Sequence, residues 1–248
     1  MTEKSNQSLT LEATVNKFSP FLMEIRKRVF FTASLIVIIA IVGFVYSDKI
    51  ISLIVKIFGI GGVNLLFTSP FQFINLSLSI SFMLAVAILF PLILLQIISF
   101  LKPALRKTEF RLLLYLLPFS VLLFVMGFGF GVVIMKYIVA ASYLQSVKLN
   151  LGNFLDISEL ISQILTTATL MGVAFQFPVI LTALMRLKVI KHKRIAKSRF
   201  WAYIVAALFA GLLPPADIPS TIVYFIVLVL LFETTLLLNR LIGKTHLN

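Results

Sequence analysis

The sequence predicts an all-α membrane protein with six transmembrane helices, and three observations lead to this fold class. Of the 248 residues, 60% are hydrophobic and only 12% are charged, whereas apolar residues make up roughly half of a soluble domain. The apolar residues form unbroken runs, and a helix needs about 20 such residues to cross a bilayer. These runs lack the polar and apolar alternation of membrane β-barrel strands. Soluble, disordered and β-barrel proteins are thereby excluded.

Six apolar runs define the predicted spans, and the whole chain 1–248 is expected to form a single polytopic membrane domain. The spans are about 29–46, 71–100, 112–136, 159–185, 199–213 and 219–241. The second run exceeds a ~30 Å hydrocarbon core, so we expect tilt or a kink at Pro91. The fifth is short and precedes Pro214 and Pro215, so we expect a concave bundle whose short fifth and sixth helices do not cross the full bilayer thickness. Residues 51–58 are apolar but too short to span, and they predict an interfacial or capping helix.

The distribution of basic residues predicts the orientation. The first 28 residues form a polar, then amphipathic segment without the apolar core and small-residue cleavage site of a signal peptide. Of the 22 Lys and Arg residues, 18 fall in the two terminal segments and in the second-to-third and fourth-to-fifth loops. The positive-inside rule therefore places both termini in the cytoplasm, or in the matrix or stroma of an organelle. The expected location is a bacterial cytoplasmic membrane or an organellar inner or thylakoid membrane.

Catalytic and cofactor chemistry is not expected from this chain. It has no cysteine, and its two histidines, His192 and His246, lie in polar segments outside the apolar runs. Thiolate metal sites and axial haem ligation at membrane depth are thus disfavoured. The sequence also lacks a Walker motif and a Ser/His/Asp set at membrane depth. We predict a protein that is not an enzyme and that holds no cofactor or metal.

Polar residues inside the apolar runs are the first functional candidates, because ionisable and polar groups are costly there. Glu233 lies about two-thirds along the last span. It is either a carboxyl bonded to another helix of the bundle or part of a polar patch that receives a partner's helix. Gln176 lies two residues before Pro178, which frees a backbone carbonyl. Its amide either replaces the backbone hydrogen bond that the helix loses at the proline or has a functional role. Gln96, five residues after Pro91, allows the same two interpretations.

Two carboxylates on the predicted cytoplasmic side form a second candidate group. Glu24 precedes Arg28 by four residues, and Glu109 is the one acid in the basic turn KPALRKTEFR, so local ion pairs are the simplest interpretation. Alternatively, both face one surface and bind a basic peptide, because a guanidinium and a carboxylate meet as a two-point fork. The spacing of Gly127 and Gly131 predicts close helix packing.

Five segments in chain order, spanning about residues 20–240, resemble the TatC family, the multi-spanning receptor subunit of the twin-arginine protein translocase. The segments are FLMEIRKRV, TSPFQF, FPLILLQIISFLKPALRKTEFR, MGVAFQFPVIL, and LLPPADIPS followed by LLFETTLLL. The chain departs from the family pattern at three points. Phe21 replaces a usual histidine, the threonine of a TPPD turn is lost, and Gln176 replaces an intramembrane glutamate.

The resemblance implies roles for these positions. A cytoplasmic site for twin-arginine signal peptides would comprise Glu24, Arg26 and Glu109. Intramembrane polar positions, including those where partners dock, would be Gln96, Gln176, Asp217, Thr221 and Glu233. Positions that shape the helices would be Pro91, Phe100, Pro103 and Pro178. Implied partners are TatA/TatB-type single-span proteins, signal peptides of folded cargo, further copies of the chain in a receptor complex, and the lipid bilayer. Nucleic acid is not an expected partner, and the implied energy source is the proton-motive force.

Two other classes remain as alternatives. An ion-coupled small-solute transporter should carry several ionisable residues at mid-membrane, whereas only Glu233 qualifies. A structural subunit of a respiratory or ATP-synthase complex should show histidine ligands or a mid-span arginine, and the spans contain neither. Co-purification with TatA/TatB-like single-span proteins would favour the translocase receptor, and co-purification with large redox subunits would favour the structural subunit.

Overall fold

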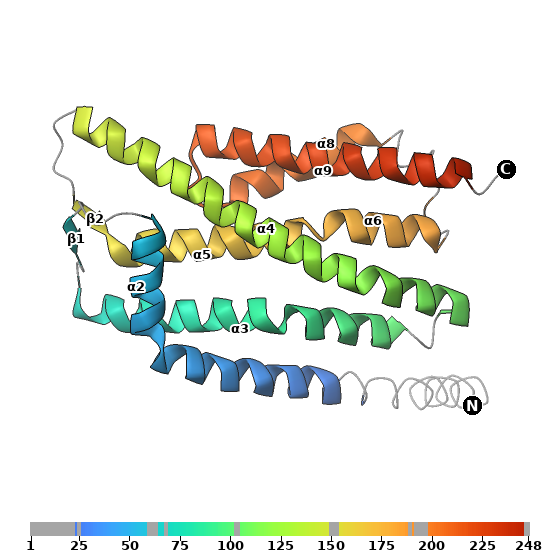
Figure 1. Ribbon diagram of the computed structural model, residues 1–248, viewed down its shortest axis with the longest axis horizontal. Coiled ribbons are helices and arrows are strands. Elements are labelled where there is room, and N and C mark those ends of the chain that lie inside the picture. Colours follow the sequence, from blue (N-terminus) through green and yellow to red (C-terminus); the bar gives the residue numbers. More distant parts are fainter. Residues whose placement is uncertain are drawn as a thin grey trace, which may run out of the picture.

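The structure is a computed structural model that describes residues 23, 26–58, 64–66, 69–101, 105–148, 154–187, 190 and 198–245. Long helices run side by side between two ends of a bundle, and one short helix lies across one of these ends (Figure 1). The helices are Arg26–Val45, α2 (Ser47–Phe58), α3 (Pro70–Leu101), α4 (Lys107–Lys148), α5 (Ile157–Ala174), α6 (Phe177–Arg186), α8 (Arg199–Leu212) and α9 (Ile218–Thr245). Two three-residue strands, β1 (Asn64–Leu66) and β2 (Phe154–Asp156), complete the described part.

Five helical segments among the described residues are long and apolar enough to cross a membrane. They are Arg26–Val45, Phe71–Phe100, Lys107–Gln145, Ile157–Arg186 and Ile218–Arg240. The helix α8 is shorter, since its 14 residues rise only about 21 Å at 1.5 Å per residue. The predicted short fifth helix is thus present, and the all-α membrane class is confirmed.

The sixth helix is not short, and that prediction is wrong. Helix α9 has 28 residues, and its apolar part Ile218–Arg240 alone has 23. Pro214 and Pro215 lie before α9, and Pro219 occupies its first turn, where the missing N–H costs no helical hydrogen bond. Because no proline follows, nothing in the sequence stops α9 early.

Two prolines act differently in the second and fourth spans. Helix α3 remains one helix of 32 residues through Pro91, about 48 Å long, which favours tilt in a ~30 Å core. The fourth span is instead two helices, because Phe175 and Gln176 form a turn between α5 and α6. Pro178 lies in the first turn of α6, where a proline starts a helix well.

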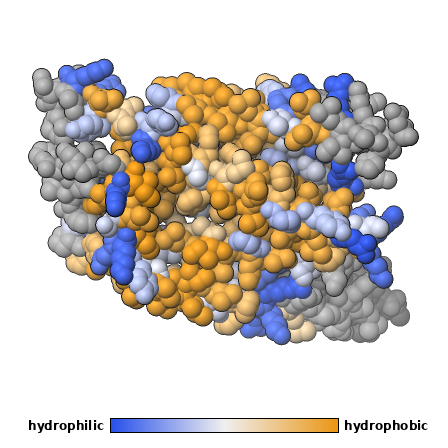
Figure 2. Space-filling model, in the orientation of Figure 1, coloured by the Kyte–Doolittle hydropathy of each residue, from blue (hydrophilic) through white to orange (hydrophobic). Residues whose placement is uncertain are grey.

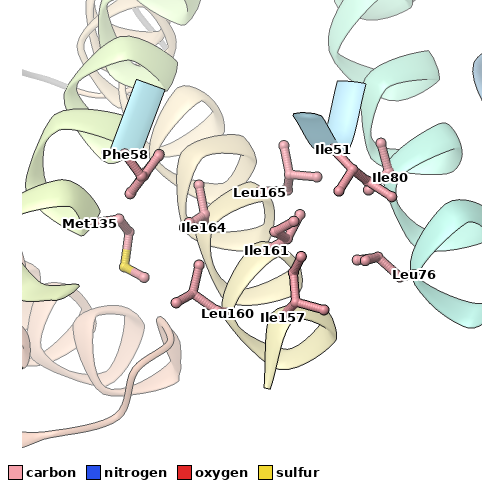
Figure 3. Close-up of a cluster of buried hydrophobic side chains, with 10 residues drawn as sticks. All are labelled: Ile51, Phe58, Leu76, Ile80, Met135, Ile157, Leu160, Ile161, Ile164 and Leu165. Carbon is pink, nitrogen blue, oxygen red and sulfur yellow. The ribbon is translucent and has the colours of Figure 1, made fainter. Parts of the chain in front are cut away.

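The end of the bundle opposite the N-terminal helix start is closed by α2 and the strand pair. The helix predicted at residues 51–58 is present and begins earlier, at Ser47. Ile51 and Phe58 of α2 join a buried apolar cluster with side chains of α3, α4 and α5 (Figure 3). The parallel strands pair Asn64 with Phe154. Helix α2 therefore packs on the bundle by its apolar face, as a capping helix does.

Helices α4 and α5 approach each other through glycines, as the Gly127 and Gly131 spacing predicted. A methyl group on Gly131 would lie 2.6 Å from the Ala168 Cα atom, and one on Gly127 would lie 2.7 Å from the Met171 carbonyl oxygen. On α5, a methyl group on Gly172 would lie 2.7 Å from the Phe124 ring. Only residues without a side chain allow this backbone separation.

The outer surface carries a broad hydrophobic belt with hydrophilic residues concentrated toward the two ends (Figure 2). The helix Arg26–Val45 exposes a row of large apolar side chains, among them Val37, Ile41 and Val45. A soluble protein rarely exposes apolar patches of this size. The belt is the surface expected to face lipid.

Candidate functional site

The predicted cytoplasmic carboxylate site lies partly within the described residues. Glu24 and Pro103 fall outside them. Arg26 is exposed where the first helix begins, and Glu109 is in the first turn of α4. One Glu109 carboxylate oxygen, Oε2, accepts the backbone N–H of Arg106 at 2.9 Å. Glu109 thus caps α4, a role that fixes its carboxylate without occupying every acceptor position.

The starts of the first helix and of α4 lie at the same end of the bundle (Figure 1). The end of α9 lies there too, so the first and last described helices share one end. The predicted topology puts the basic terminal segments and the second-to-third loop on one side of the membrane, and this orientation stays a prediction.

Gln96 ties the first helix to α3. Its Oε1 accepts a short hydrogen bond from the Thr32 hydroxyl, which also lies 2.9 Å from the Arg28 carbonyl oxygen. Thr32 is buried, whereas the residues on either side of it are exposed. Phe100, one helical turn after Gln96, lines a groove between the first helix and α3 together with Gln96. The partner Thr32 was missed by sequence reasoning, although a polar residue within an apolar run is a signal.

Gln176 is buried and completes the backbone at the break between α5 and α6. Its own N–H donates to the Val173 carbonyl at 3.0 Å, three residues back, so the Gly172 carbonyl loses its usual helical donor. The Gln176 side-chain amide replaces that donor at 3.3 Å. It also donates to the Ser120 carbonyl at 3.2 Å and accepts a short bond from the Ser120 hydroxyl. These bonds support the interpretation that the Gln176 amide replaces a backbone hydrogen bond lost at the helix break.

An apolar groove of about 340 Å³ opens beside this pair, between α3, α4 and α6. Ile97, Leu117 and Ile180 contribute to its apolar lining, and Ser120 and Gln176 form its polar spot. The groove can hold an apolar segment, with the buried amide and hydroxyl already engaged with each other.

Glu233 bonds to the neighbouring helix α8. Its carboxylate accepts the Tyr203 hydroxyl at 2.7 Å and lies 3.4 Å from the Arg199 guanidinium. The Glu233 side chain is still 34% exposed. The structure thus supports the bundle-bonded interpretation and leaves part of the carboxylate on the surface. Arg199 and Tyr203 were missed because they lie at least 30 residues away in sequence.

The turn between α8 and α9 places Asp217 on the surface and fixes the backbone beside it. Asp217 is exposed, and its carbonyl accepts the Thr221 N–H at 3.0 Å. The Pro214 carbonyl accepts hydrogen bonds from the hydroxyls of Thr167, at 2.5 Å, and Tyr224, at 3.2 Å. Sequence reasoning also missed these two hydroxyls. Thr167 anchors the turn to α5, and Tyr224 anchors it to α9.

A second apolar groove, of about 190 Å³, lies between α6, α8 and α9. Ala206 and Leu228 line it, and so does Phe232, the neighbour of Glu233. A partly exposed carboxylate therefore lies next to an apolar depression on the last two helices.

Long apolar helices, buried hydrogen bonds between helices and open apolar grooves define the class as a polytopic helical membrane protein. The sequence profile of the family described as Sec-independent protein translocase protein (TatC) matches residues 20–226. The chain belongs to this family of multi-pass membrane proteins, whose members serve protein transport as components of a translocase.

Relatives and solved structures agree with this assignment. The chain is 29% identical over 223 residues to the Sec-independent protein translocase protein TatCy of Bacillus subtilis, covering 88% of this chain and 86% of the relative. It is 27% identical to TatC of Carboxydothermus hydrogenoformans, with 88% and 90% covered. The crystal structure of a twin-arginine translocase receptor, TatC, superposes with a TM-score of 0.73 at 27% identity. That match covers 89% of this chain and 98% of the solved one.

Proposed function

We propose that this protein is the core receptor subunit of a twin-arginine translocase. In this role it binds the twin-arginine signal peptides of folded proteins and recruits TatA/TatB-type single-span partners for transport driven by the proton-motive force. The observation that carries the proposal is the match of fold and sequence, over 89% of the chain, to the crystal structure of a twin-arginine translocase receptor.

Signal recognition is assigned to Glu24, Arg26 and Glu109. A carboxylate can hold an arginine guanidinium by two parallel hydrogen bonds, which a lysine ammonium cannot match. Glu109 suits this role because the Arg106 N–H already orients its carboxylate. The helix that begins near Arg26 and the helix that begins near Glu109 start at the same end of the bundle (Figure 1).

Binding of the signal's apolar segment is assigned to the groove between α3, α4 and α6. Its lining is almost wholly apolar. A hydrophobic segment that enters the groove would therefore bury apolar surface, which favours binding. Because Gln176 is an amide, it cannot ionise, and no proton-carrying step is assigned to it.

Partner docking is assigned to α8 and α9. The partly exposed Glu233, the surface residue Asp217 and the adjacent Thr221 offer polar contacts, and the groove beside Phe232 offers an apolar one. A single-span helix with one polar residue could satisfy both, since interhelical hydrogen bonds at membrane depth favour association.

Site-specific photo-crosslinking tests the receptor function. A photoreactive residue at Lys107, close to Glu109, should crosslink to a signal peptide bearing Arg-Arg and much less to the same peptide bearing Lys-Lys. The substitution Glu24→Ala should abolish the crosslink. A probe at Arg240, at the same end of the bundle but on α9, serves as the control for nonspecific labelling.

Equal labelling by both peptides would contradict the proposal and leave Glu109 as a helix cap. The ion-coupled transporter would then become the leading interpretation. If no single-span partner co-purifies with the protein, only the docking assignment to α8 and α9 is contradicted.

A further inference from the structure

A third groove, of about 400 Å³, lies between the first helix and α3. It shares Ile97 with the groove beside Gln176, and its mouth follows the proposed signal-recognition residues in sequence. Its wall on the first helix runs from Arg28 to Ile36. These positions are eight residues apart, about 12 Å along a helix at 1.5 Å per residue. One leaflet of a ~30 Å hydrocarbon core is about 15 Å deep. With Arg28 at the membrane surface, as the predicted span from residue 29 implies, the groove would extend through most of one leaflet.

The groove opens sideways toward lipid. Val29 and Ile97, which line it on opposite helices, are 61% and 51% exposed. Ala33, on the first helix, contributes only a methyl group to the wall. A slot that is open along its side and apolar along its length fits a flexible hydrocarbon chain better than a folded element.

The mouth of the groove is cationic. Arg28 lines it, and Arg26 and Lys27 directly precede it in sequence, against the single acid Glu24. Basic residues at the cytoplasmic membrane surface attract anionic lipid headgroups.

The side-chain amide of Gln96 is a hydrogen-bond donor deeper in the groove than Arg28. Gln96 uses its Oε1 to accept the Thr32 hydroxyl, and within the described part of the chain its Nε2 donates to no protein atom. In a phospholipid the ester carbonyls lie just below the phosphate. The groove thus presents, in order of depth, a cation, an amide donor and an apolar slot.

We propose that this groove binds one anionic phospholipid, with the phosphate on Arg28, an ester carbonyl on Gln96 Nε2 and one acyl chain along Ala33 and Ile36. The lipid would fill the space between the first helix and α3. The described contacts of these two helices include the hydrogen bond between Thr32 and Gln96 and the close approach of Gly43 to Ser81. This site does not depend on signal-peptide binding.

Lipid binding to the purified full chain in detergent tests the proposal. Native mass spectrometry would compare phosphatidylglycerol with phosphatidylcholine of identical acyl chains. The wild type should prefer phosphatidylglycerol about fivefold, the effect expected of one basic residue at a membrane surface. Arg28→Gln should lose this preference and Arg28→Lys should keep it. Ala33→Phe, which fills the slot, should weaken binding of both lipids.

The matched control is Arg240→Gln, an equal loss of charge at the same end of the bundle but outside the groove; it should retain the wild-type preference. Melting temperatures of all variants separate misfolding from lost binding. The proposal is overturned if Arg28→Gln and Arg240→Gln behave alike, or if Ala33→Phe binds both lipids normally. It is also overturned if a probe at Ile36 crosslinks to the signal peptide and not to phosphatidylglycerol. The Lys107 crosslinking result stands separately from each of these outcomes.

Discussion

At the residue scale, the polar side chains inside this apolar bundle work as pairs between helices. Thr32 bonds to Gln96, Ser120 to Gln176, and Tyr203 to Glu233. Interhelical hydrogen bonds in membranes contribute on average about 0.6 kcal/mol and at most about 1.7 kcal/mol. Such pairs select which helix faces which neighbour, while apolar packing supplies most of the association.

The substitution Gln176→Leu should lower stability by about 1–3 kcal/mol, because it leaves buried polar groups of Ser120 and Gly172 without a donor or acceptor. Thermal unfolding in detergent measures the effect. Ser120→Ala and the double variant complete a mutant cycle, and the double variant should cost less than the two single losses together. Strict additivity would mean that the two side chains are not coupled.

Glu233→Gln should change partner binding more than stability. Arg199 and Glu233 are 50% and 34% exposed, and ion pairs this open contribute little to folding. We therefore expect an unchanged melting temperature but reduced co-purification of the TatA/TatB-type partner. Tyr203→Phe removes the hydroxyl and keeps the carboxylate, so it should retain the partner. If both variants bind the partner normally, Glu233 has only its intramolecular role.

At the element scale, α4 and α5 depend on glycines for their close approach, and α5 depends on Asp156 for its start. The Asp156 side chain accepts the backbone N–H groups of Ser158 and Glu159, at 2.9 and 3.2 Å. Its other oxygen accepts the Gln72 amide of α3 at 2.9 Å. A single carboxylate thus begins one helix and attaches it to another.

Gly131→Ala should destabilise the bundle, because the added methyl group would meet the Ala168 backbone at 2.6 Å and force α4 and α5 apart. Overpacking of this kind costs about 1–3 kcal/mol. Gly129→Ala is the matched control on the same helix, since no atom lies within 4 Å of its added methyl group. Its melting temperature should equal or slightly exceed that of the wild type. Equal effects of the two substitutions would exclude a packing role for Gly131.

Asp156→Ala should cost about 1–2 kcal/mol through the lost N-terminal cap of α5. Asp156→Asn keeps an oxygen that can accept both N–H groups, so it should retain most of the stability. Thermal unfolding compares the two variants. Hydrogen exchange of the first turn of α5 should rise in Asp156→Ala alone; a uniform rise in both would place the effect elsewhere.

At the scale of the whole molecule, the apolar belt fits a bundle inserted in a membrane, and the start of the first helix lies at the same end of the bundle as the end of α9 (Figures 1 and 2). The basic loops predict that this side is the cytoplasm. Because the chain contains no cysteine, single cysteines can be added to an otherwise unreactive protein.

Cysteines replacing Ser5 and Asn248 should react with a membrane-impermeant maleimide only after the membrane is opened. Cysteines replacing Lys49 and Lys148 should react in intact cells. If the cysteines at positions 5 and 248 are labelled from opposite sides, the chain crosses the membrane an odd number of times. If positions 5 and 248 react in intact cells and positions 49 and 148 do not, the orientation is the opposite of the predicted one.

The sequence by itself determined the membrane class, the helix α2, the short α8 and the close packing at Gly127 and Gly131. Each follows from local composition: apolar run length, a proline pair, or residue size at helical spacing. The family resemblance could also be stated from motifs in order, without any contact between them. The length of α9 was misjudged because Pro214 and Pro215 were read as limiting both flanking helices, although they limit only α8.

Only the tertiary structure decided which polar residues meet. Thr32 and Gln96 are 64 residues apart, Ser120 and Gln176 are 56 apart, and Tyr203 and Glu233 are 30 apart. No local pattern links such positions, because a helix surface repeats every 3.6 residues and gives no information about the neighbouring helix. The break between α5 and α6 at Phe175 also involves contacts between helices. Pro178 weakened the helix locally, while the bonds from Gln176 to Ser120 and Gly172 satisfy the backbone at the turn.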